Sequence, residues 1–195
     1  MITEIDKYMW RCACEILAEW EKKGWDLFIS VNISPKDFYY MDVPKYIRGL
    51  IEEYGVKPER LRVEITETVM MNDADKIIGI LNEFRRHGFI VEMDDFGSGY
   101  SSLNMLKDMP VDVIKIDMKF LGKSDDKQRA DTIVKSVIDL SKELGLTSLT
   151  EGVETLNQYD GLSKMGCILF QGYYFSKPLP VNEFEELFEK GKENV

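Results

Sequence analysis

Polar side chains suited to metal chemistry stand at or near the end of each of six short apolar runs. Five of the six runs supply carboxylate or amide oxygens alone, and the fourth supplies a lysine as well. In chain order they are Asn32 in F-I-S-V-N-I-S, Glu64 in L-R-V-E-I-T-E, Asp94 and Asp95 in V-E-M-D-D, Lys115 and Asp117 in V-I-K-I-D, Glu151 and Glu154 in T-E-G-V-E, and Gln171 in I-L-F-Q-G.

These residue types favour one kind of chemistry. Carboxylates gathered together repel one another unless a counter-charge lies between them. Oxygen ligands without histidine or thiolate select hard cations, namely Mg²⁺, Mn²⁺ or Ca²⁺. Two such ions about 4 Å apart suit the hydrolysis of a phosphodiester. Lys115 can orient or deprotonate the attacking water, or meet phosphate charge.

The elements that must position these residues alternate between helical and strand patterns. Strands that alternate with helices predict a mostly parallel sheet, and in a (β/α)₈ barrel the carboxyl ends of the strands build the active site. The competing interpretation is a set of unrelated polar strand ends. The expected strands are Leu27 to Val31, Leu61 to Ile65, Ile90 to Met93, Val113 to Ile116, Thr147 to Leu149 and Ile168 to Phe170, and helices precede or separate them.

The expected helices carry apolar residues at helical spacing. The first runs from about Thr3 to Lys23, with Ile5, Met9, Cys12, Ile16 and Trp20 on one face. Others follow Asp42 and Asp73, the latter ending at Gly88. A long helix ends at Gly145, another ends at Gly166, and the last covers Asn182 to Lys190.

Composition excludes several classes of protein. At 195 residues the chain is most simply one domain, 1–195. Its 35 acids against 25 bases argue against binding to polymeric nucleic acid or to an anionic membrane. The sequence has neither an apolar run long enough to span a membrane nor a signal peptide. Its three cysteines favour reduced thiols in the cytoplasm, and the single histidine, His87, is expected to be structural.

The stretch V-E-M-D-D-F-G-S-G-Y-S-S has two interpretations. Adjacent side chains on a strand point to opposite faces, so Asp94 and Asp95 can serve one site only where the strand ends. Glycines then let the backbone turn tightly beside a ligand. Asp and Gly are also common in ordinary polar turns.

The motifs together identify a family. V-N-I-S, E-I-T-E, D-D-F-G-S-G-Y-S-S, K-I-D, E-G-V-E-T and Q-G-Y-Y-F-S-K-P resemble, in order and spacing, the EAL-domain family of bacterial cyclic di-GMP phosphodiesterases. The resemblance implies a modified (β/α)₈ TIM-type barrel whose first strand is antiparallel. It also implies hydrolysis of cyclic di-GMP to linear pGpG with Mg²⁺ or Mn²⁺, two ions being expected, and inhibitory binding of Ca²⁺.

The resemblance assigns expected roles to the residues. Lys115, Asp117 and Glu151 form the catalytic group, in which Lys115 contacts the attacking water. Glu67 steadies the loop after Asp95, and that loop is tied to dimerisation and metal binding. The expected metal ligands are Asn32, Glu64, Asp94, Asp95, Glu151 and Gln171, and the loop residues are Phe96, Gly97, Ser98 and Gly99. A homodimer, and a GGDEF or sensory domain in the parent protein, are the expected partners.

The chain departs from the family at its amino end, because it contains no Glu-Ala-Leu motif. C-E-I-L-A-E-W is no substitute, since Ile16, Leu17 and Trp20 fit a buried helix face and Glu15 a solvated one. Six strands are visible where a barrel needs eight. We therefore expect an N-terminally truncated barrel: a fragment or misassigned start, a truncated gene product, or a half completed by another chain.

Three hypotheses follow. The chain is a cyclic di-GMP phosphodiesterase domain, a degenerate domain that binds cyclic di-GMP or a partner protein without catalysis, or a structural dimerisation module. The retained Lys115 and Glu151 disfavour the last and weaken the second, whereas the missing first strand favours the second for this chain.

Overall fold

The fold is a curled sheet of six parallel strands with helices on its outer side. The computed structural model describes residues 2–71, 73–97, 103–117 and 127–192. Each strand pairs in parallel with the next, in the order β1-β2-β3-β4-β5-β6. All six expected strands are confirmed: β1 Ile29–Asn32, β2 Leu61–Thr66, β3 Val91–Asp94, β4 Val113–Asp117, β5 Thr147–Glu151 and β6 Leu169–Phe170.

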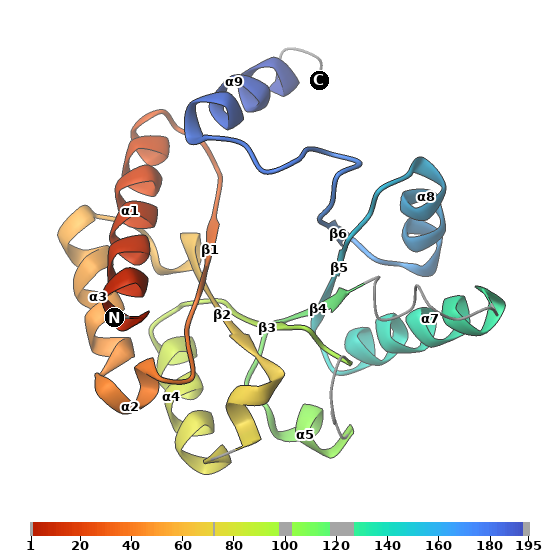
Figure 1. Cartoon of the computed structure of the whole chain (residues 1–195), viewed down its shortest axis with the longest axis horizontal. Coiled ribbons are helices and arrows are strands. Elements are labelled where there is room, and N and C mark those ends of the chain that lie inside the picture. Colours follow the sequence, from red (N-terminus) through yellow and green to blue (C-terminus); the bar gives the residue numbers. More distant parts are fainter. Residues whose placement is uncertain (1, 72, 98–102, 118–126, 193–195) are drawn as a thin grey trace.

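Helices surround the sheet in the order in which the chain reaches them (Figure 1). The expected helices are confirmed, and four short segments join them that sequence periodicity could not reveal because each spans only three to six residues. The long helices are α1 Ile2–Lys22, α3 Val43–Tyr54, α4 Ala74–Arg86, α7 Lys127–Glu143, α8 Leu156–Met165 and α9 Val181–Lys192; the short segments are α2 Asp37–Tyr40, α5 Leu103–Asp108 and two 3₁₀ turns, Pro58–Arg60 and Glu67–Met71.

Local chemistry explains where two of the helices begin and end. Asp42 accepts a hydrogen bond from the Lys45 backbone N–H and so caps α3, which ends at Gly55 in a left-handed conformation (φ 69°). Thr155 and Gln158 form a reciprocal capping box at the start of α8. These signals fix the helix ends and therefore the points at which the chain returns to the sheet.

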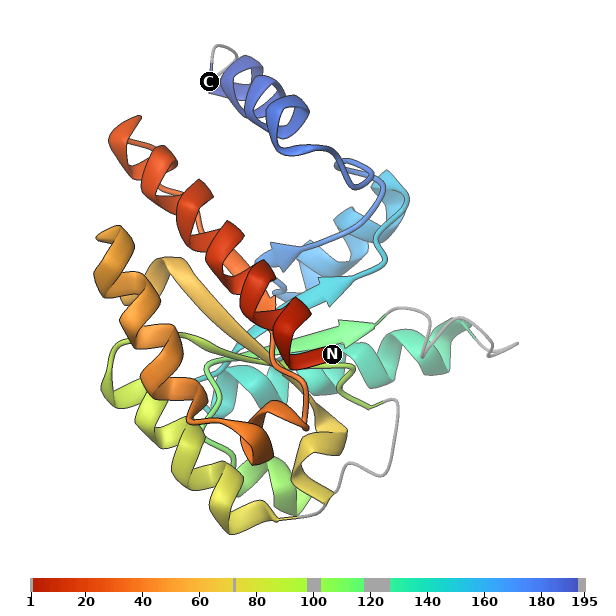
Figure 2. The same cartoon turned by 60° about the vertical axis from the view of Figure 1, so that its left-hand side comes forward.

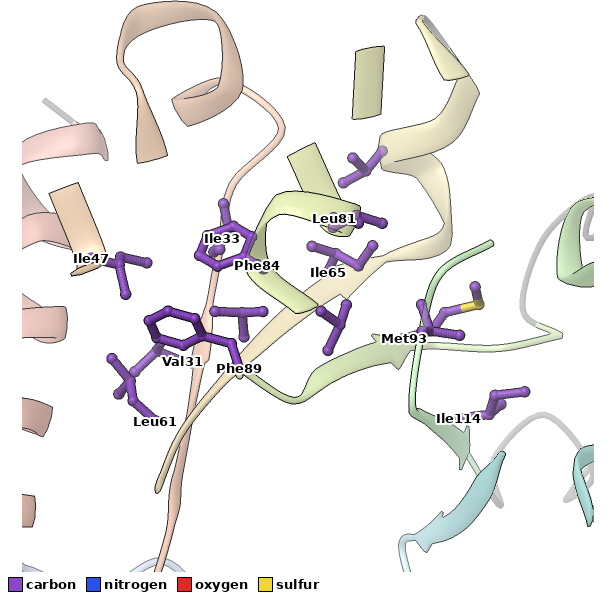
Figure 3. Packing of buried hydrophobic residues seen from close by; sticks show 14 of the residues in the cluster. Val31, Ile33, Ile47, Leu61, Ile65, Leu81, Phe84, Phe89, Met93 and Ile114 are labelled. Carbon is purple, nitrogen blue, oxygen red and sulfur yellow. The ribbon is translucent and has the colours of Figure 1, made fainter. Parts of the chain in front are cut away.

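The apolar core lies between the sheet and the outer helices. Alternate strand residues such as Val63, Ile65 and Val91 point to this side and are fully buried. Phe84 of α4 packs at right angles against Phe89, which leads into β3 (Figure 3). The opposite face carries polar residues along β2 and β3 and at the carboxyl ends of β4 and β5.

The buried face expected for α1 is confirmed at Leu17 and Trp20 but is wrong in the first half of the helix. Ile5 and Met9 are more than half exposed, whereas Trp10, Ala13, Cys14, Leu17 and Trp20 are buried. Trp10 also donates a hydrogen bond from Nε1 to the backbone oxygen of Asn32, 3.0 Å away. The sequence contains apolar residues on several faces of this helix, so periodicity alone could not choose among them.

The carboxyl-terminal helix α9 lies beside the far end of α1, as two views agree (Figures 1 and 2). Glu185 accepts hydrogen bonds from the Trp20 indole and the Lys23 ammonium, both at 2.8 Å. Phe188 packs against Trp25 with ring centroids 5.0 Å apart. The chain thus runs from the β6 edge of the sheet back to the helix that precedes the β1 edge.

Two remaining expectations are also met. His87 follows the last residue of α4, and its Nε2 lies 2.8 Å from an Arg48 nitrogen, which is a structural role. Cys12, Cys14 and Cys167 are all free thiols. Within the described ranges, no helix combines the length and apolar character needed to cross a membrane.

Candidate functional site

The centre of the candidate site is the ammonium group of Lys115 on β4. Its Nζ lies 2.6 Å from Glu151 Oε1, 2.8 Å from Glu64 Oε1 and 3.3 Å from Asp94 Oδ1. The Lys115 side chain is only 6% exposed, and the three acids are between 8% and 19% exposed. Four residues that the sequence placed in one site are therefore in contact, and each comes from a different strand: Glu64 from β2, Asp94 from β3, Lys115 from β4 and Glu151 from β5.

Strand register explains why these side chains meet. Asp117 pairs with Glu151 across β4 and β5, and Asn32 pairs with Glu64 across β1 and β2. Side chains two residues apart on a strand share a face, so Lys115 and Asp117 both point away from the helix-covered side. The parallel strands bring this polar face to their carboxyl ends together.

Burial and mutual repulsion shift the acids towards their neutral forms. Burial raises the pKa of Glu64 to about 7, with Lys115 opposing the shift and Asp94 adding to it. Burial also raises the pKa of Glu151, again against Lys115. Burial disfavours the charge on Lys115, but its hydrogen bonds to Glu151 and Glu64 outweigh this and raise its pKa. The site therefore holds a firmly protonated lysine among more acids than it can neutralise.

The two neighbouring aspartates lie where β3 ends in a strained turn. Asp95 has a left-handed backbone (φ 56°), which is uncommon for a residue other than glycine. The Phe96 backbone N–H then donates to the Lys115 backbone oxygen at 3.2 Å, and Gly97 also has a positive φ, 91°. Burial, together with the charges of Asp94 and Asp117, raises the pKa of Asp95. This turn keeps the acid pair beside Lys115, as the sequence suggested.

Other expected site residues lie around this centre without joining the lysine cluster. Asn32 ends β1 and is exposed, and Gln171 follows β6 and is exposed. Glu67 is buried, with an Oε2 atom that has no hydrogen-bond partner among the described groups. Phe96 is partly buried against the core. Ser98 and Gly99 lie outside the described residues.

The carboxylate and amide oxygens of the site are the kind of ligand that a hard cation prefers, but three of the carboxylates are arranged around the Lys115 ammonium. In the part of the chain that the structure describes, no group of three or more His, Cys, Asp or Glu side chains is placed to hold a metal ion. Asp94 Oδ1 is nevertheless buried with the Lys115 ammonium 3.3 Å away but no contact of hydrogen-bond geometry, and the pKa values of Glu64, Asp95 and Glu151 are all raised. Such acids gain from any added positive charge, so the residues fit divalent ions.

Sequence reasoning missed a second polar cluster on the same face of the sheet. Glu92 on β3 is 1% exposed and accepts hydrogen bonds from Ser30 at 2.7 Å and Arg62 at 2.9 Å. The Arg62 guanidinium also lies over the Phe28 ring. Ser30, Arg62 and Glu92 each stand two positions before a predicted metal ligand. The alternation of polar residues along each strand could therefore have revealed the cluster.

An open parallel barrel with an acidic, lysine-centred site at its carboxyl rim defines a TIM-barrel-type protein. A family model described as "EAL domain" matches residues 1–178. The chain belongs to the EAL domain family.

Named relatives agree with this assignment. This chain is 34% identical over 187 residues to the cyclic di-GMP phosphodiesterase NbdA of Pseudomonas aeruginosa. The aligned region covers 95% of this chain and 24% of NbdA. The signaling protein YkoW of Bacillus subtilis is 33% identical over 95% of this chain and 23% of its own length. The chain thus spans about a quarter of the length of these relatives.

Solved structures share the fold. The EAL domain of Mycobacterium smegmatis DcpA has a TM-score of 0.90 at 32% identity, over 98% of this chain and 86% of that one. The PaMucR phosphodiesterase in complex with c-di-GMP has a TM-score of 0.87 at 32% identity, over 94% and 74%. Klebsiella pneumoniae BlrP1, solved with manganese or calcium and cyclic di-GMP, is 29% identical, with TM-scores of 0.80 and 0.79 over about 90% of this chain and 44% of BlrP1.

Proposed function

We propose that this chain is a divalent-metal-dependent phosphodiesterase domain that hydrolyses cyclic di-GMP to linear pGpG in bacterial signalling. The observation that carries the proposal is the ammonium of Lys115 held between Glu64, Asp94 and Glu151 at the carboxyl rim. A related phosphodiesterase of the same fold was solved with c-di-GMP bound. Family membership alone does not carry the step to turnover.

The metal ligands we propose are Asn32, Glu64, Asp94, Asp95, Glu151 and Gln171. Two Mg²⁺ or Mn²⁺ ions held there would activate a water molecule at neutral pH and would stabilise negative charge on the leaving oxygen. The donors are the oxygen atoms that such ions prefer, and manganese and calcium accompany cyclic di-GMP in structures of the related BlrP1. Calcium is proposed to bind in an inhibitory way.

The chain's own residues orient the reactants. Because hydrogen bonds to two acids raise the pKa of Lys115, its ammonium donates hydrogen bonds and does not accept a proton. We propose that Lys115 and Asp117 position the attacking water. Glu67 supports the loop that begins with Phe96 and Gly97 and continues through Ser98 and Gly99, and this loop is proposed to couple the site to a homodimer.

The setting of the domain is also a proposal. The three free thiols support a cytoplasmic location. The relatives are several times longer than this chain, and one of them, MucR of Pseudomonas aeruginosa, is a bifunctional diguanylate cyclase and phosphodiesterase. A GGDEF or sensory domain in the parent protein is proposed on that basis.

The test is hydrolysis of cyclic di-GMP by the purified chain, followed by chromatography of the product with Mg²⁺, Mn²⁺, Ca²⁺ or a chelator. Glu151→Gln should reduce turnover by about 10²-fold or more. Glu143→Gln, which removes an exposed acid from α7, should not. Titration calorimetry with cyclic di-GMP in Ca²⁺ measures binding separately: binding in Ca²⁺ together with no turnover in Mg²⁺ or Mn²⁺ supports the receptor alternative, and the absence of both binding and turnover refutes both functions.

A further inference from the structure

Two carboxyl groups meet where the first turns of α1 approach the segment after β1. Asp6 lies on α1, and Asp37 is the first residue of α2, within hydrogen-bonding reach of Asp6. Asp37 is 0% exposed, and its Oδ2 accepts a hydrogen bond from the Ser34 backbone N–H at 3.0 Å. Asp37 Oδ1 and Asp6 Oδ2 are buried and have no donor among the described groups.

Two ionised carboxylates in this position would repel each other with nothing between them. A single shared proton removes the repulsion and gives the unpaired oxygens a hydrogen bond, because it turns one carboxyl group into a donor for the other. Burial raises the pKa of Asp6, and the hydrogen bond and charge of Asp37 add to the rise.

The neighbouring contacts place that proton on Asp6. The Lys7 ammonium bonds Glu4 at 2.9 Å and lies over the Tyr46 ring of α3. The hydrogen bond to Glu4, and then the charges of Glu4 and Asp37, raise the pKa of Lys7. Asp37 already accepts the Ser34 backbone N–H through Oδ2, so Asp6 is the member of the pair that donates.

We propose that Asp6 carries a proton that it donates to Asp37, and that this hydrogen bond fastens the segment after β1 to α1 in a proton-dependent way. The same segment is held by the Trp10 indole, which donates to the Asn32 backbone oxygen at 3.0 Å. Asp6 and Asp37 are thus positioning residues for the turn that follows Asn32.

Unfolding by urea at several pH values, from about pH 3 to about pH 8, tests the shared proton. A carboxyl group whose pKa is raised in the folded state stabilises the fold at low pH, and this stability is lost as the pH rises through that pKa. Asp6→Asn and Asp37→Asn each replace the shared proton by an amide hydrogen. Either variant should remove up to about one proton from the pH dependence of unfolding.

The control is Asp131→Asn, which removes an exposed acid from α7 and should follow the wild type. Equal pH dependence in the wild type and in both Asn variants of the pair would overturn the proposal. So would an equal flattening in Asp131→Asn.

A local measurement keeps the proposal testable if an Asn variant fails to fold. In wild-type protein with ¹³C-labelled aspartate, the Asp6 carboxyl signal should titrate above its ordinary range. Protection of the Ser34 amide against hydrogen exchange should fall over the same pH interval, because its acceptor is Asp37. An Asp6 signal with an ordinary titration, or Ser34 protection that does not change, would show that no proton is shared.

Discussion

Replacing Lys115 by methionine tests whether the site is held together by one ammonium group. Lys115 is 6% exposed and contacts three acids that are 8%, 18% and 19% exposed. Removing one partner of a buried ionic cluster costs about 3–5 kcal/mol, because the remaining charges stay buried without compensation. At about pH 8, without divalent ions, Lys115→Met should therefore lower the free energy of unfolding by this amount.

The stability lost in Lys115→Met should become smaller as the pH falls, because Glu64 becomes protonated. Its pKa in the folded protein is about 7, well above the ordinary value, and without Lys115 the opposing effect disappears and the pKa rises further. A raised carboxyl pKa means that stability is present at low pH and is lost as the pH rises through it. The variant should thus recover up to about 1.4 kcal/mol for each pH unit below that pKa.

The assay is urea denaturation followed by tryptophan fluorescence, at about pH 8 and about pH 6, for the wild type, Lys115→Met and the double variant Glu64→Gln/Lys115→Met. The double variant should be more stable than Lys115→Met at the higher pH, because one repelling charge has gone. Lys164→Met, at an exposed position on α8, is the matched control. Equal stability of Lys115→Met and the wild type at about pH 8 would refute the ionic cluster.

Three further predictions concern the acids and the backbone around them. Excess Mg²⁺, Mn²⁺ or Ca²⁺ should raise the melting temperature by mass action, and Asp94→Asn should reduce the shift; an unchanged midpoint in the wild type would mean that no metal site forms. Glu92→Gln should lower the free energy of unfolding by about 2–3 kcal/mol, because it leaves Arg62 without its ion-pair partner. This is less than for a fully buried pair, since the Arg62 side chain is 17% exposed, and replacing both Glu92 and Arg62 by Met should cost less. Gly172→Ala should cost roughly 1–3 kcal/mol in chemical denaturation, since a Cβ there would collide with the Val153 backbone; an unaffected midpoint would show that this loop yields.

The strand order and the rim could be predicted because both follow from periodicity. Predicted helical segments separated the apolar runs in four of the five intervals, which favours parallel neighbours, and polar residues at strand ends then had to share one edge. The exposed face of α1 could not be predicted in this way, since Ile5 and Met9 have the same apolar character as the buried Leu17. Packing against the neighbouring elements makes that choice, and it is a tertiary effect.

For part of the site, the sequence predicted the kinds of residue present but not which of them contact one another. Sequence showed that Lys115 belongs among acids, but strand register decides that Glu64, Asp94 and Glu151 are the ones it contacts. The pairing of Asp6 with Asp37 joins residues 31 positions apart, and nothing in the local pattern of either residue points to the other. Contacts of this kind depend on how a helix end meets a loop, and periodicity carries no information about them.

The state of Lys115 limits the ways in which the site can move a proton. A lysine whose pKa is raised by two carboxylates is a poor base near neutral pH. The groups that can accept a proton near neutrality are the buried acids, above all Glu64 with its pKa of about 7. Added cations would lower that pKa by favouring the ionised form. Metal binding and proton release at the site should therefore be linked, so that divalent ions bind more tightly as the pH rises through about 7 and each binding event releases protons that calorimetry in buffers of different ionisation enthalpy can count.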